Sequence, residues 1–343
     1  MRSQRTIKRD VSFEGVGLHT GTHCRVHIRQ APIDNGVVFH KVGRLGLGTN
    51  WLGKQRLDRL GRLDKLSRLS MLSGHKSEVN GSDGGYPEGR DMSFAARVSS
   101  VVDTAFATTL GNGREVVRTV EHLLAVLSAL SIDNVDIAVE GSEIPILDGS
   151  AKEIAELVLY AGIKKQRKKM PFIKILSPVK LDDKHSSVAI YPYDGRRITF
   201  RLFFDDHFLG EQYMSIDLNA DTFIEDIAPA RTFGFLKDVE YIRANGLAKG
   251  GSLDNAVIFT EDSIVNESGL RFDDECVRHK ILDSIGDFSL FGFPIEGHIV
   301  ADKSGHTTNV KFLKKLMTCP ECWEVVAEEV ESSRYPVLSY SYI

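Results

Sequence analysis

The segment RHKILD, residues 278–283, places a histidine and a carboxylate four residues apart, at His279 and Asp283. On an α-helix, in which successive side chains turn by about 100°, Asp287 lies on the same side as this pair. The opposite side of the same helix is apolar and consists of Val277, Ile281, Ile285 and Phe288. The segment therefore predicts a helix with an apolar back and a front that carries candidate metal ligands.

A histidine and an aspartate at this spacing are also typical of the solvated face of an amphipathic helix. A Glu121-His122 pair far upstream supplies further candidates. A catalytic zinc ion generally takes three protein ligands of the His, Asp or Glu type and leaves a fourth position open to water. Together the two segments predict one zinc site.

The overall composition is that of a globular protein. The chain has 343 residues, which is enough for about two domains, and its 42% hydrophobic and 26% charged residues exclude a disordered chain. The net charge of −4 gives no basic field that would favour nucleic acid. The N-terminal MRSQRTIKRD is not followed by an apolar segment, and no run of about eighteen apolar residues occurs. We expect a cytoplasmic protein.

The four cysteines are Cys24, Cys276, Cys319 and Cys322. They are too few and too scattered for the disulfide framework of a small secreted domain, so we expect reduced thiols. Cys319 and Cys322 form a C-x-x-C motif, but it lacks the second pair of a zinc ribbon and the βαβ context of a thioredoxin. We interpret the motif as incidental, with a redox or metal-binding role as the alternative.

Hydrophobic periodicity and turn residues outline alternating strands and helices. Residues 5–40 have the pattern of short strands, and residues 116–130 have helical periodicity. Ser150 is expected to cap a helix over 151–160, and the basic run 164–169 is typical of a polar break. Further strands are predicted at 134–139, 172–175, 187–191, 198–204 and 298–301. Two units with elements in similar order predict a pair of related α+β domains.

Residues 41–93 depart from this pattern. Leucines recur every three residues from Leu57 to Leu72, interleaved with arginines and lysines, and such a repeat winds around a helix instead of forming one stripe. The following stretch to Asp91 is rich in Gly, Ser and charged residues. We predict a flexible, solvated insertion; a basic amphipathic contact with membrane lipids is the alternative.

Six motifs extend this interpretation across most of the chain. They are FEGVGLHTG (13–21), TVEHLLAVLSAL (119–130), EIPILDGSA (143–151), ARTFGF (230–235), GLRFDDECVRHKILDSIGD (269–287) and KSGHTTN (303–309). In order and spacing they closely resemble the UDP-3-O-acyl-N-acetylglucosamine deacetylases, the zinc amidases of lipid A biosynthesis. The resemblance runs from about residue 4 to about residue 316 and fails only in 41–93 and after 317.

The resemblance implies an α+β fold of two related layered α/β-sandwich domains with the metal site at their interface. The domains would span 1–165, with the insertion 41–93, and 170–316, with an inserted unit at 233–266 that forms an acyl passage. Residues 317–343 would be a C-terminal tail. The activity implied is hydrolysis of the N-acetyl amide of UDP-3-O-acyl-N-acetylglucosamine, which gives acetate and the free amine.

The resemblance also implies roles for individual residues. The metal ligands would be His122, His279 and Asp283; two histidines and one carboxylate suit Fe(II) as well as zinc, so both metals stay open. The other roles would be general base for Glu121, second acid or base for His306, oxyanion donor for Thr232, substrate contact for Lys280 and orientation of His306 for Asp287. Amide hydrolysis requires an activated water, a stabilised oxyanion and a proton for the departing amine, and these groups would supply all three.

Substrate contacts are expected beside this centre. Lys280 and His19 are candidates for the diphosphate. Candidates for the lining of the acyl passage, each of which is alternatively ordinary core, are Phe233, Leu236, Val239, Ile242, Leu253 and Ile258. Some family members have a cysteine that can approach the zinc on the strand where this chain has Ala107. We read the Lys249-Gly250-Gly251-Ser252 segment as a turn and not as a phosphate site.

Two other functions stay open at this point. The first is a zinc hydrolase that acts on another N-acyl sugar, and the second is a non-catalytic protein that binds a nucleotide sugar. The expected partner is the acylated UDP-sugar, without nucleic acid and with at most a peripheral membrane contact. We expect a monomer.

Overall fold

The computed structural model describes residues 1–43, 93–205 and 207–328. Apart from its first and last residues, the predicted insertion 41–93 lies outside the described residues, and so does the tail from 329 onward. The two strands that flank the insertion, β4 (Val37–Val42) and β5 (Ser93–Ala95), pair antiparallel. The insertion therefore joins two neighbouring strands of one sheet.

The first part of the chain forms a mixed sheet with two helices on one face. The strand order is β2-β3-β9-β4-β5, in which β9 pairs antiparallel with β3 and parallel with β4. The other strands are β2 (Val11–Val16), β3 (His23–Gln30) and β9 (Val135–Glu140), and the helices are α1 (Glu121–Ala129) and α2 (Lys152–Ala161). Both helices are rich in buried apolar residues, and the core of this half lies between them and the sheet.

Two smaller sheets complete this half. One has the order β6-β7-β8, with β6 (Val101–Asp103), β7 (Thr109–Gly111) and β8 (Val116–Val117). The other pairs β1 (Ser3–Ile7) with β10 (Ile163–Lys169). The prediction of a polar break at 164–169 is therefore wrong: the basic run is a strand with a single partner, and lysines are common on exposed strand edges because they oppose further pairing.

The second half contains a larger sheet. Strand β18 (Ile295–Asp302) pairs with β13, β14 and β11. The surrounding strands are β11 (Phe172–Ile175), β12 (Val179–Asp183), β13 (Ser186–Tyr191), β14 (Arg196–Phe203), β15 (Glu211–Asp217) and β19 (Trp323–Val326). Because β19 pairs with β11, residues 323–326 belong to the sheet and not to a free tail.

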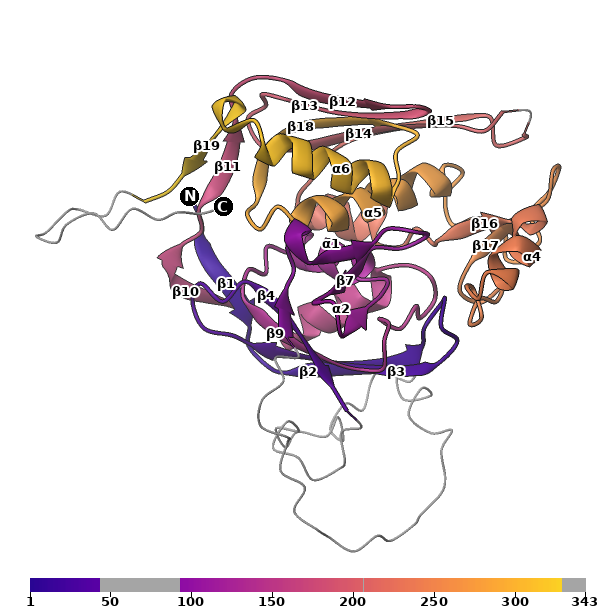
Figure 1. Ribbon diagram of the computed structural model, residues 1–343, viewed down its shortest axis with the longest axis horizontal. Coiled ribbons are helices and arrows are strands. Elements are labelled where there is room, and N and C mark those ends of the chain that lie inside the picture. Colours follow the sequence, from indigo (N-terminus) through magenta and orange to yellow (C-terminus); the bar gives the residue numbers. More distant parts are fainter. Residues whose placement is uncertain (44–92, 206, 329–343) are drawn as a thin grey trace, which may run out of the picture.

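The helices of this half are α5 (Glu275–Ser289) and α6 (His306–Met317), with a single turn α3 (Ala220–Thr222) before them. A separate small unit contains β16 (Phe233–Phe235), α4 (Leu236–Ala244) and β17 (Val257–Phe259), with β16 and β17 parallel. In Figure 1 this unit projects from one side of the molecule. It falls within the predicted insert 233–266.

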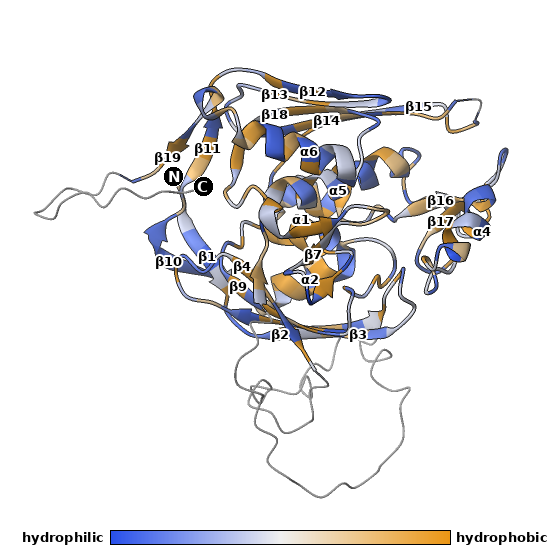
Figure 2. Cartoon of the chain, viewed as in Figure 1, coloured by the Kyte–Doolittle hydropathy of each residue, from blue (hydrophilic) through white to orange (hydrophobic). Residues whose placement is uncertain are grey.

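The arrangement is layered. Figure 1 shows the two large sheets on opposite outer sides, with α1 and α2 against one, α5 and α6 against the other, and the four helices between them. Figure 2 shows many hydrophobic residues along these inner helices and along the strands of both sheets. The α+β fold predicted from the sequence is confirmed, with a helix-to-helix contact between its two halves.

Helix α5 confirms the predicted periodicity but not its surroundings. The apolar side packs into the core as expected, and each buried Ile or Leu there stabilises the fold by roughly 1.5–3 kcal/mol. The polar front is buried as well, because it faces α1 and α6 instead of solvent. The alternative interpretation of His279 and Asp283 as a solvated face is therefore wrong.

Two helix boundaries differ from the sequence prediction. The helix predicted over 116–130 begins at Glu121, because residues 116–117 pair with β7 and Thr119 has a φ of 58°, which no helix accommodates. Helix α2 begins one residue later than predicted, with Ala151 at the N-cap, although the Ser150 hydroxyl still accepts a hydrogen bond from Lys152 N. None of the helices in the described residues is long and apolar enough to cross a membrane.

Candidate active site

The site lies where α1 and α5 cross, and a glycine allows the crossing to be close. A Cβ added to Gly286 on α5 would lie 2.1 Å from the carbonyl oxygen of Glu121 on α1. Only a residue without a side chain fits so near a backbone atom. The close approach brings Glu121 and His122, at the start of α1, next to the polar front of α5.

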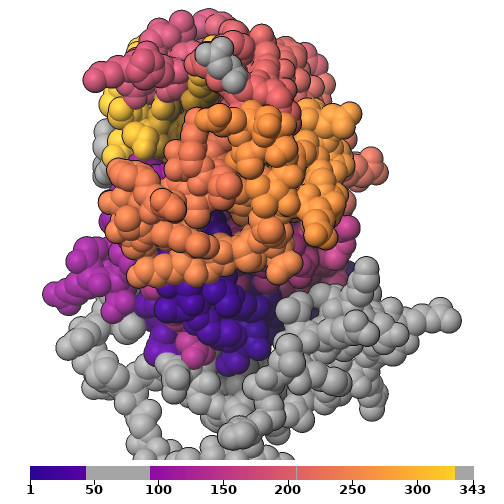
Figure 3. Space-filling model, turned by 90° about the vertical axis from the view of Figure 1, so that its right-hand side faces the viewer, coloured from indigo at the N-terminus to yellow at the C-terminus, as the bar shows by residue number. Residues whose placement is uncertain are grey.

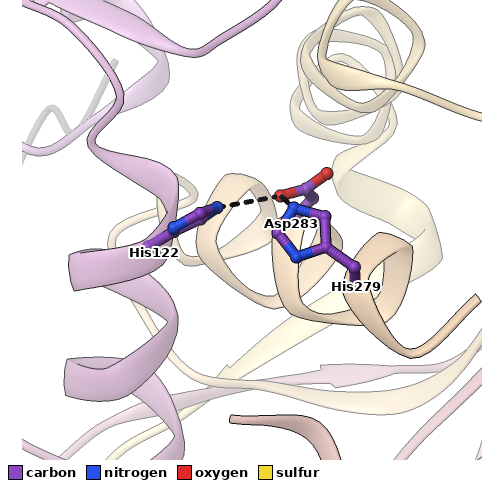
Figure 4. Close-up of side chains that lie close together, drawn as sticks. All are labelled: His122, His279 and Asp283. Carbon is purple, nitrogen blue, oxygen red and sulfur yellow. Dashed lines mark ion pairs between the residues drawn. The ribbon is translucent and has the colours of Figure 1, made fainter. Parts of the chain in front are cut away.

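The three predicted metal ligands meet at this crossing. Figure 4 shows His122 on α1 turned toward His279 and Asp283 on α5. Asp283 Oδ1 lies 3.7 Å from His122 Nε2 and 3.4 Å from His279 Nε2. The candidate ligand atoms lie within 4.8 Å of one another, and the three residues are buried. A tetrahedral zinc ion with bonds of about 2.0–2.2 Å to nitrogen and oxygen fits such a set after small rotations.

Hydrogen bonds orient these groups for a cation. His279 Nδ1 lies 3.1 Å from the carbonyl oxygen of Ala230, to which it can only donate, so Nε2 is left to face the other two residues as a base. Burial lowers the pKa of His279 to about 4, which keeps the imidazole neutral. Burial opposes ionisation of Asp283, but the Lys280 ammonium outweighs it and holds the pKa of Asp283 well below the usual range. A neutral imidazole and an ionised carboxylate are the forms that bind metal.

Glu121 is next to His122 but makes different contacts. Its Oε2 accepts a hydrogen bond of 3.0 Å from Thr108 N, and its Oε1 lies 3.9 Å from His306 Nε2. Burial raises the pKa of Glu121 to about 7, against the opposing charge of His306. A carboxylate with a pKa near neutrality can both take up and release a proton at physiological pH.

His306, the first residue of α6, faces Glu121 from the other side. Its Nδ1 donates a hydrogen bond of 2.9 Å to Asp287 Oδ2. Burial opposes its protonation, but the carboxylates of Asp287 and Glu121 outweigh this effect and raise the pKa of His306 to about 9. His306 is therefore a cation at neutral pH, next to the carboxylate of Glu121. The contact predicted between His306 and Asp287 is present.

Two residues that the sequence analysis did not single out complete this network. The Thr108 hydroxyl donates a hydrogen bond of 2.6 Å to Asp287 Oδ1, and Asn309 Nδ2 donates one of 2.9 Å to Asp287 Oδ2. Thr108 thus contacts Glu121 through its backbone and Asp287 through its side chain. Asn309 ends the KSGHTTN motif and could have been found there. Thr108 lies outside every motif, so only the fold reveals it.

Lys280 lies beside the metal ligands. Its Nζ donates to Asp283 Oδ2 over 2.5 Å and lies 6.0 Å from the centre of the Phe233 ring. Lys280 contacts Asp283 Oδ2, whereas the two histidines lie nearest Asp283 Oδ1. Lys280 therefore stabilises the ionised form of Asp283 in this structure, and its contact with substrate stays a prediction.

Thr232 lies just before β16. Its backbone N donates to Gly149 O, and its carbonyl accepts from Val257 N. Two residues earlier, Ala230 O contacts His279, and one residue later the Phe233 ring lies 6.3 Å from the His279 ring. The segment that contains Thr232 therefore runs along the ligand His279.

His19 lies in the GVGLHTG loop and is buried, with 5% of its surface exposed. Its backbone N donates to Glu143 Oε1 over 2.9 Å, and neither ring nitrogen has a hydrogen-bond partner within the described residues. Burial lowers the pKa of its imidazole. His19 is therefore neutral, so a role toward phosphate would use hydrogen bonding instead of charge.

None of the candidate lining residues of the acyl passage is fully buried. Leu236 and Leu253 are 50% and 48% exposed. The others are half-buried: Phe233, Val239, Ile242 and Ile258. Figure 3 shows the residues that follow 233, in orange, as a broad surface directly above the indigo N-terminal residues. There, Gly250 N donates to Leu18 O, and a Cβ on Gly250 would lie 2.3 Å from Gly17 O.

That contact explains Gly250 as a close backbone approach, and residues 249–250 form a turn as interpreted from the sequence. Ala107 differs from the expectation: it is buried in the bend before β7 and does not lie on a strand. The turn arises because Phe106, the preceding residue, has a φ of 62°, outside the extended region.

Comparisons with known proteins identify a family for this chain. A family model described as UDP-3-O-acyl N-acetylglycosamine deacetylase matches residues 4–63 and 83–318. The expectation that the resemblance fails throughout 41–93 is therefore wrong, because only 64–82 are left out of that segment. Named UDP-3-O-acyl-N-acetylglucosamine deacetylases are similar over nearly their whole length. The protein of Thermodesulfovibrio yellowstonii is 41% identical over 96% of both chains.

Two other relatives carry the same name. The protein of Syntrophotalea carbinolica is 39% identical over 98% of this chain and 94% of its own. That of Oleidesulfovibrio alaskensis is 40% identical over 96% of this chain and 93% of its own. The match covers α1, α5 and α6 and every motif on which the resemblance rests. With a buried His-His-Asp set at the centre of the matched region, the chain belongs to the UDP-3-O-acyl-N-acetylglucosamine deacetylase family.

Proposed function

We propose that the protein hydrolyses the N-acetyl amide of UDP-3-O-acyl-N-acetylglucosamine with the help of a metal ion, and so releases acetate in lipid A biosynthesis. The observation that carries the metal requirement is the convergence of His122, His279 and Asp283 at the crossing of α1 and α5, with Glu121 beside them. Family membership supports the deacetylation and its substrate.

The donor set suits a divalent cation. His122, His279 and Asp283 would hold Zn²⁺, and Fe²⁺ is the alternative that the same ligands accept. Such an ion would supply Lewis-acid polarisation of the amide carbonyl. The chain itself supplies a neutral imidazole and an ionised carboxylate, without which a cation would not be held in this buried place.

Glu121 and His306 would handle the protons. Glu121, with a pKa of about 7, would accept a proton from the attacking water as general base. His306, with a pKa of about 9, is protonated and would stabilise the oxyanion or give its proton to the departing amine. Asp287 would hold the His306 ring through Nδ1 and leave Nε2 facing Glu121.

The remaining predicted residues would bind the substrate. Thr232 would donate a hydrogen bond to the oxyanion, and Lys280 and His19 would contact substrate near the diphosphate. Exposed apolar side chains on α4 and near β17 suit an acyl chain, which a short N-acyl sugar would not need. They therefore favour the acylated substrate over another N-acyl sugar. A cytoplasmic location and a monomeric state stay predictions, tested by cell fractionation and light scattering.

The decisive experiment is acetate release from UDP-3-O-acyl-N-acetylglucosamine by protein of known metal content, before and after chelation. We expect chelation to abolish release and one equivalent of Zn²⁺ or Fe²⁺ to restore it, and comparison of the two ions decides the metal. Undiminished release from metal-free protein would reject the metal requirement. No release from folded protein with a full metal complement would reject the substrate.

A further inference from the structure

A second group of metal-ligating side chains lies at the far end of α6. Glu321 and Cys322 lie in the short 3-10 turn Pro320–Cys322, which connects α6 to β19, and Cys319 is the N-cap of this turn. Their ligand atoms lie within 4.8 Å of one another, and Cys322 Sγ is 3.8 Å from Glu321 Oε1. Both cysteines are free thiols of intermediate exposure. A metal ion or another reagent can therefore reach them from solvent.

The backbone holds this turn at both ends. Cys319 N donates to Leu316 O in the last turn of α6, and Cys322 N donates to Cys319 O over 2.9 Å. Cys322 O in turn accepts from Leu176 N, at the end of β11. The Trp323 indole donates to Leu316 O over 2.9 Å and so joins the start of β19 to α6. The two thiols are thus presented together by a fixed backbone.

The electrostatic surroundings of the thiols favour a cation. Cys319 follows Thr318, the C-cap of α6, and so lies at the negative pole of the helix dipole. The Glu321 carboxylate adds a negative charge beside Cys322. A divalent ion offsets the charge of two thiolates and a carboxylate together.

We propose that Cys319, Glu321 and Cys322 bind a thiophilic divalent metal ion such as Zn²⁺, at a site separate from the active site. Tetrahedral Zn²⁺ with bonds of about 2.3 Å to sulfur and about 2.0–2.2 Å to oxygen needs ligand atoms roughly 3.5–3.8 Å apart, which small side-chain rotations supply. Three ligands leave a fourth position to water, so the ion exchanges with solvent. Binding releases the two thiol protons to solvent as the two sulfur–metal bonds form.

The two sites lie at opposite ends of one helix. Helix α6 has twelve residues and is therefore about 18 Å long, with His306 at its start and the C-x-x-C turn after its end. The family model ends its match at residue 318, directly before Cys319. The second site is therefore a feature of this chain beyond the matched region, and its occupancy does not depend on the proposed activity.

The test is a metal titration of the full-length, reduced protein. With Zn²⁺ we expect two equivalents for the native sequence and one for the double variant C319S/C322S, and the same difference of one equivalent in a His279→Ala background. With Cd²⁺, an ultraviolet thiolate-to-metal charge-transfer band should appear in the native protein and be absent from the double variant. Glu321→Gln should keep the band but bind the metal ion at least about tenfold more weakly.

Acetate release should be unchanged in C319S/C322S, because the altered residues lie about one helix length from the catalytic groups. The matched control is Cys24→Ser, a buried thiol elsewhere in the chain, which should keep both equivalents. Equal stoichiometry in native protein and double variant would overturn the proposal. So would a mass lower by two hydrogen atoms with thiols resistant to alkylation, because that result means a disulfide instead of a metal site.

Discussion

Glu121 and His122 are adjacent in the chain but face different partners, so we expect different roles for them, general base for Glu121 and metal ligand for His122. His122 faces Asp283, whereas Glu121 accepts from Thr108 N and faces His306. We predict that Glu121→Gln retains its metal and loses about 10²–10⁴-fold in turnover, the range for a positioned general base. Steady-state acetate release combined with metal analysis measures both quantities.

The matched variant is His279→Ala, which should lose metal and turnover together because it breaks the ligand set. Normal turnover in Glu121→Gln would remove Glu121 from the mechanism, and a full metal content in His279→Ala would contradict the ligand assignment.

Thr108 offers a second prediction because its neighbour provides a control. The Thr108 hydroxyl donates to Asp287, whereas the buried Thr109 hydroxyl has no hydrogen-bond partner in the described part of the chain. A hydrogen bond to a charged group contributes about 1.5–3 kcal/mol. Thr108→Val should therefore lower kcat by roughly tenfold or more, since Asp287 orients His306 less firmly. Thr109→Val should leave kcat unchanged, and an equal loss in both variants would show a general packing effect.

The sequence predicted which residues meet at the crossing of α1 and α5 but not all of their contacts. The spacing of His279 and Asp283 indicated a shared helix face, and the structure brings His122 to that face. Thr108 could not be predicted, because a threonine before a strand is typical of many loops. Its function depends on two contacts with residues 13 and 179 positions away.

Gly286 determines how closely α1 and α5 cross, which is a property of the two elements together. An added Cβ would meet the carbonyl oxygen of Glu121, a backbone atom that cannot rotate away. We predict that Gly286→Ala displaces α1 from α5, separates His122 from the other ligands and weakens metal binding by at least about tenfold. Equilibrium metal titration measures this change.

The control is Gly305→Ala at the N-cap of α6, where an added Cβ would meet no atom within 4 Å. Its metal affinity should equal that of the native protein. Unchanged affinity in Gly286→Ala would mean that the helices tolerate a wider crossing and that the ligand geometry does not depend on it.

The start of α5 is fixed by a buried ion pair. The Glu275 carboxylate accepts hydrogen bonds from the backbone N and the guanidinium of Arg231. It also accepts a hydrogen bond from the backbone N of Arg271. Both charged side chains are buried, so removal of one charge leaves the other without compensation, at a cost of about 3–5 kcal/mol. Glu275→Gln should lower the free energy of unfolding by that amount, measured by urea denaturation.

Asp274→Asn is the neighbouring control, because the Asp274 pair with Arg278 is partly exposed and contributes at most about 1 kcal/mol. If both variants lose the same small amount, the Arg231–Glu275 pair does not hold the start of α5.

The elements themselves were predictable to different degrees. The strand at 172–175 and the helix that carries His279 follow directly from hydrophobic periodicity. The strand β10 was missed because its sequence is almost entirely basic, and only pairing with β1 makes it a strand. The early start predicted for α1 failed because the positive φ at Thr119 is set by surrounding contacts and not by helix propensity.

At the scale of the whole molecule, the site exists only when both halves of the chain are together. His122 and Glu121 come from the half with the N-terminal sheet, whereas His279, Asp283 and His306 come from the other half. A metal ion bound by His122, His279 and Asp283 would therefore connect the two halves as well as serve the reaction. Catalysis and overall stability are expected to depend on the same ion.

The last prediction follows from this connection. A ligand that binds only the folded state stabilises it by about 4 kcal/mol at a free concentration one thousand times its dissociation constant. Removal of metal should therefore lower the melting temperature by roughly 8–16 °C, at about 2–4 °C per kcal/mol. Calorimetry in the C319S/C322S background isolates this ion from the site proposed at the end of α6. His279→Ala in that background should melt at one temperature with or without Zn²⁺. If Zn²⁺ also leaves the melting temperature of C319S/C322S with its native His279 unchanged, the two halves associate independently of the ion.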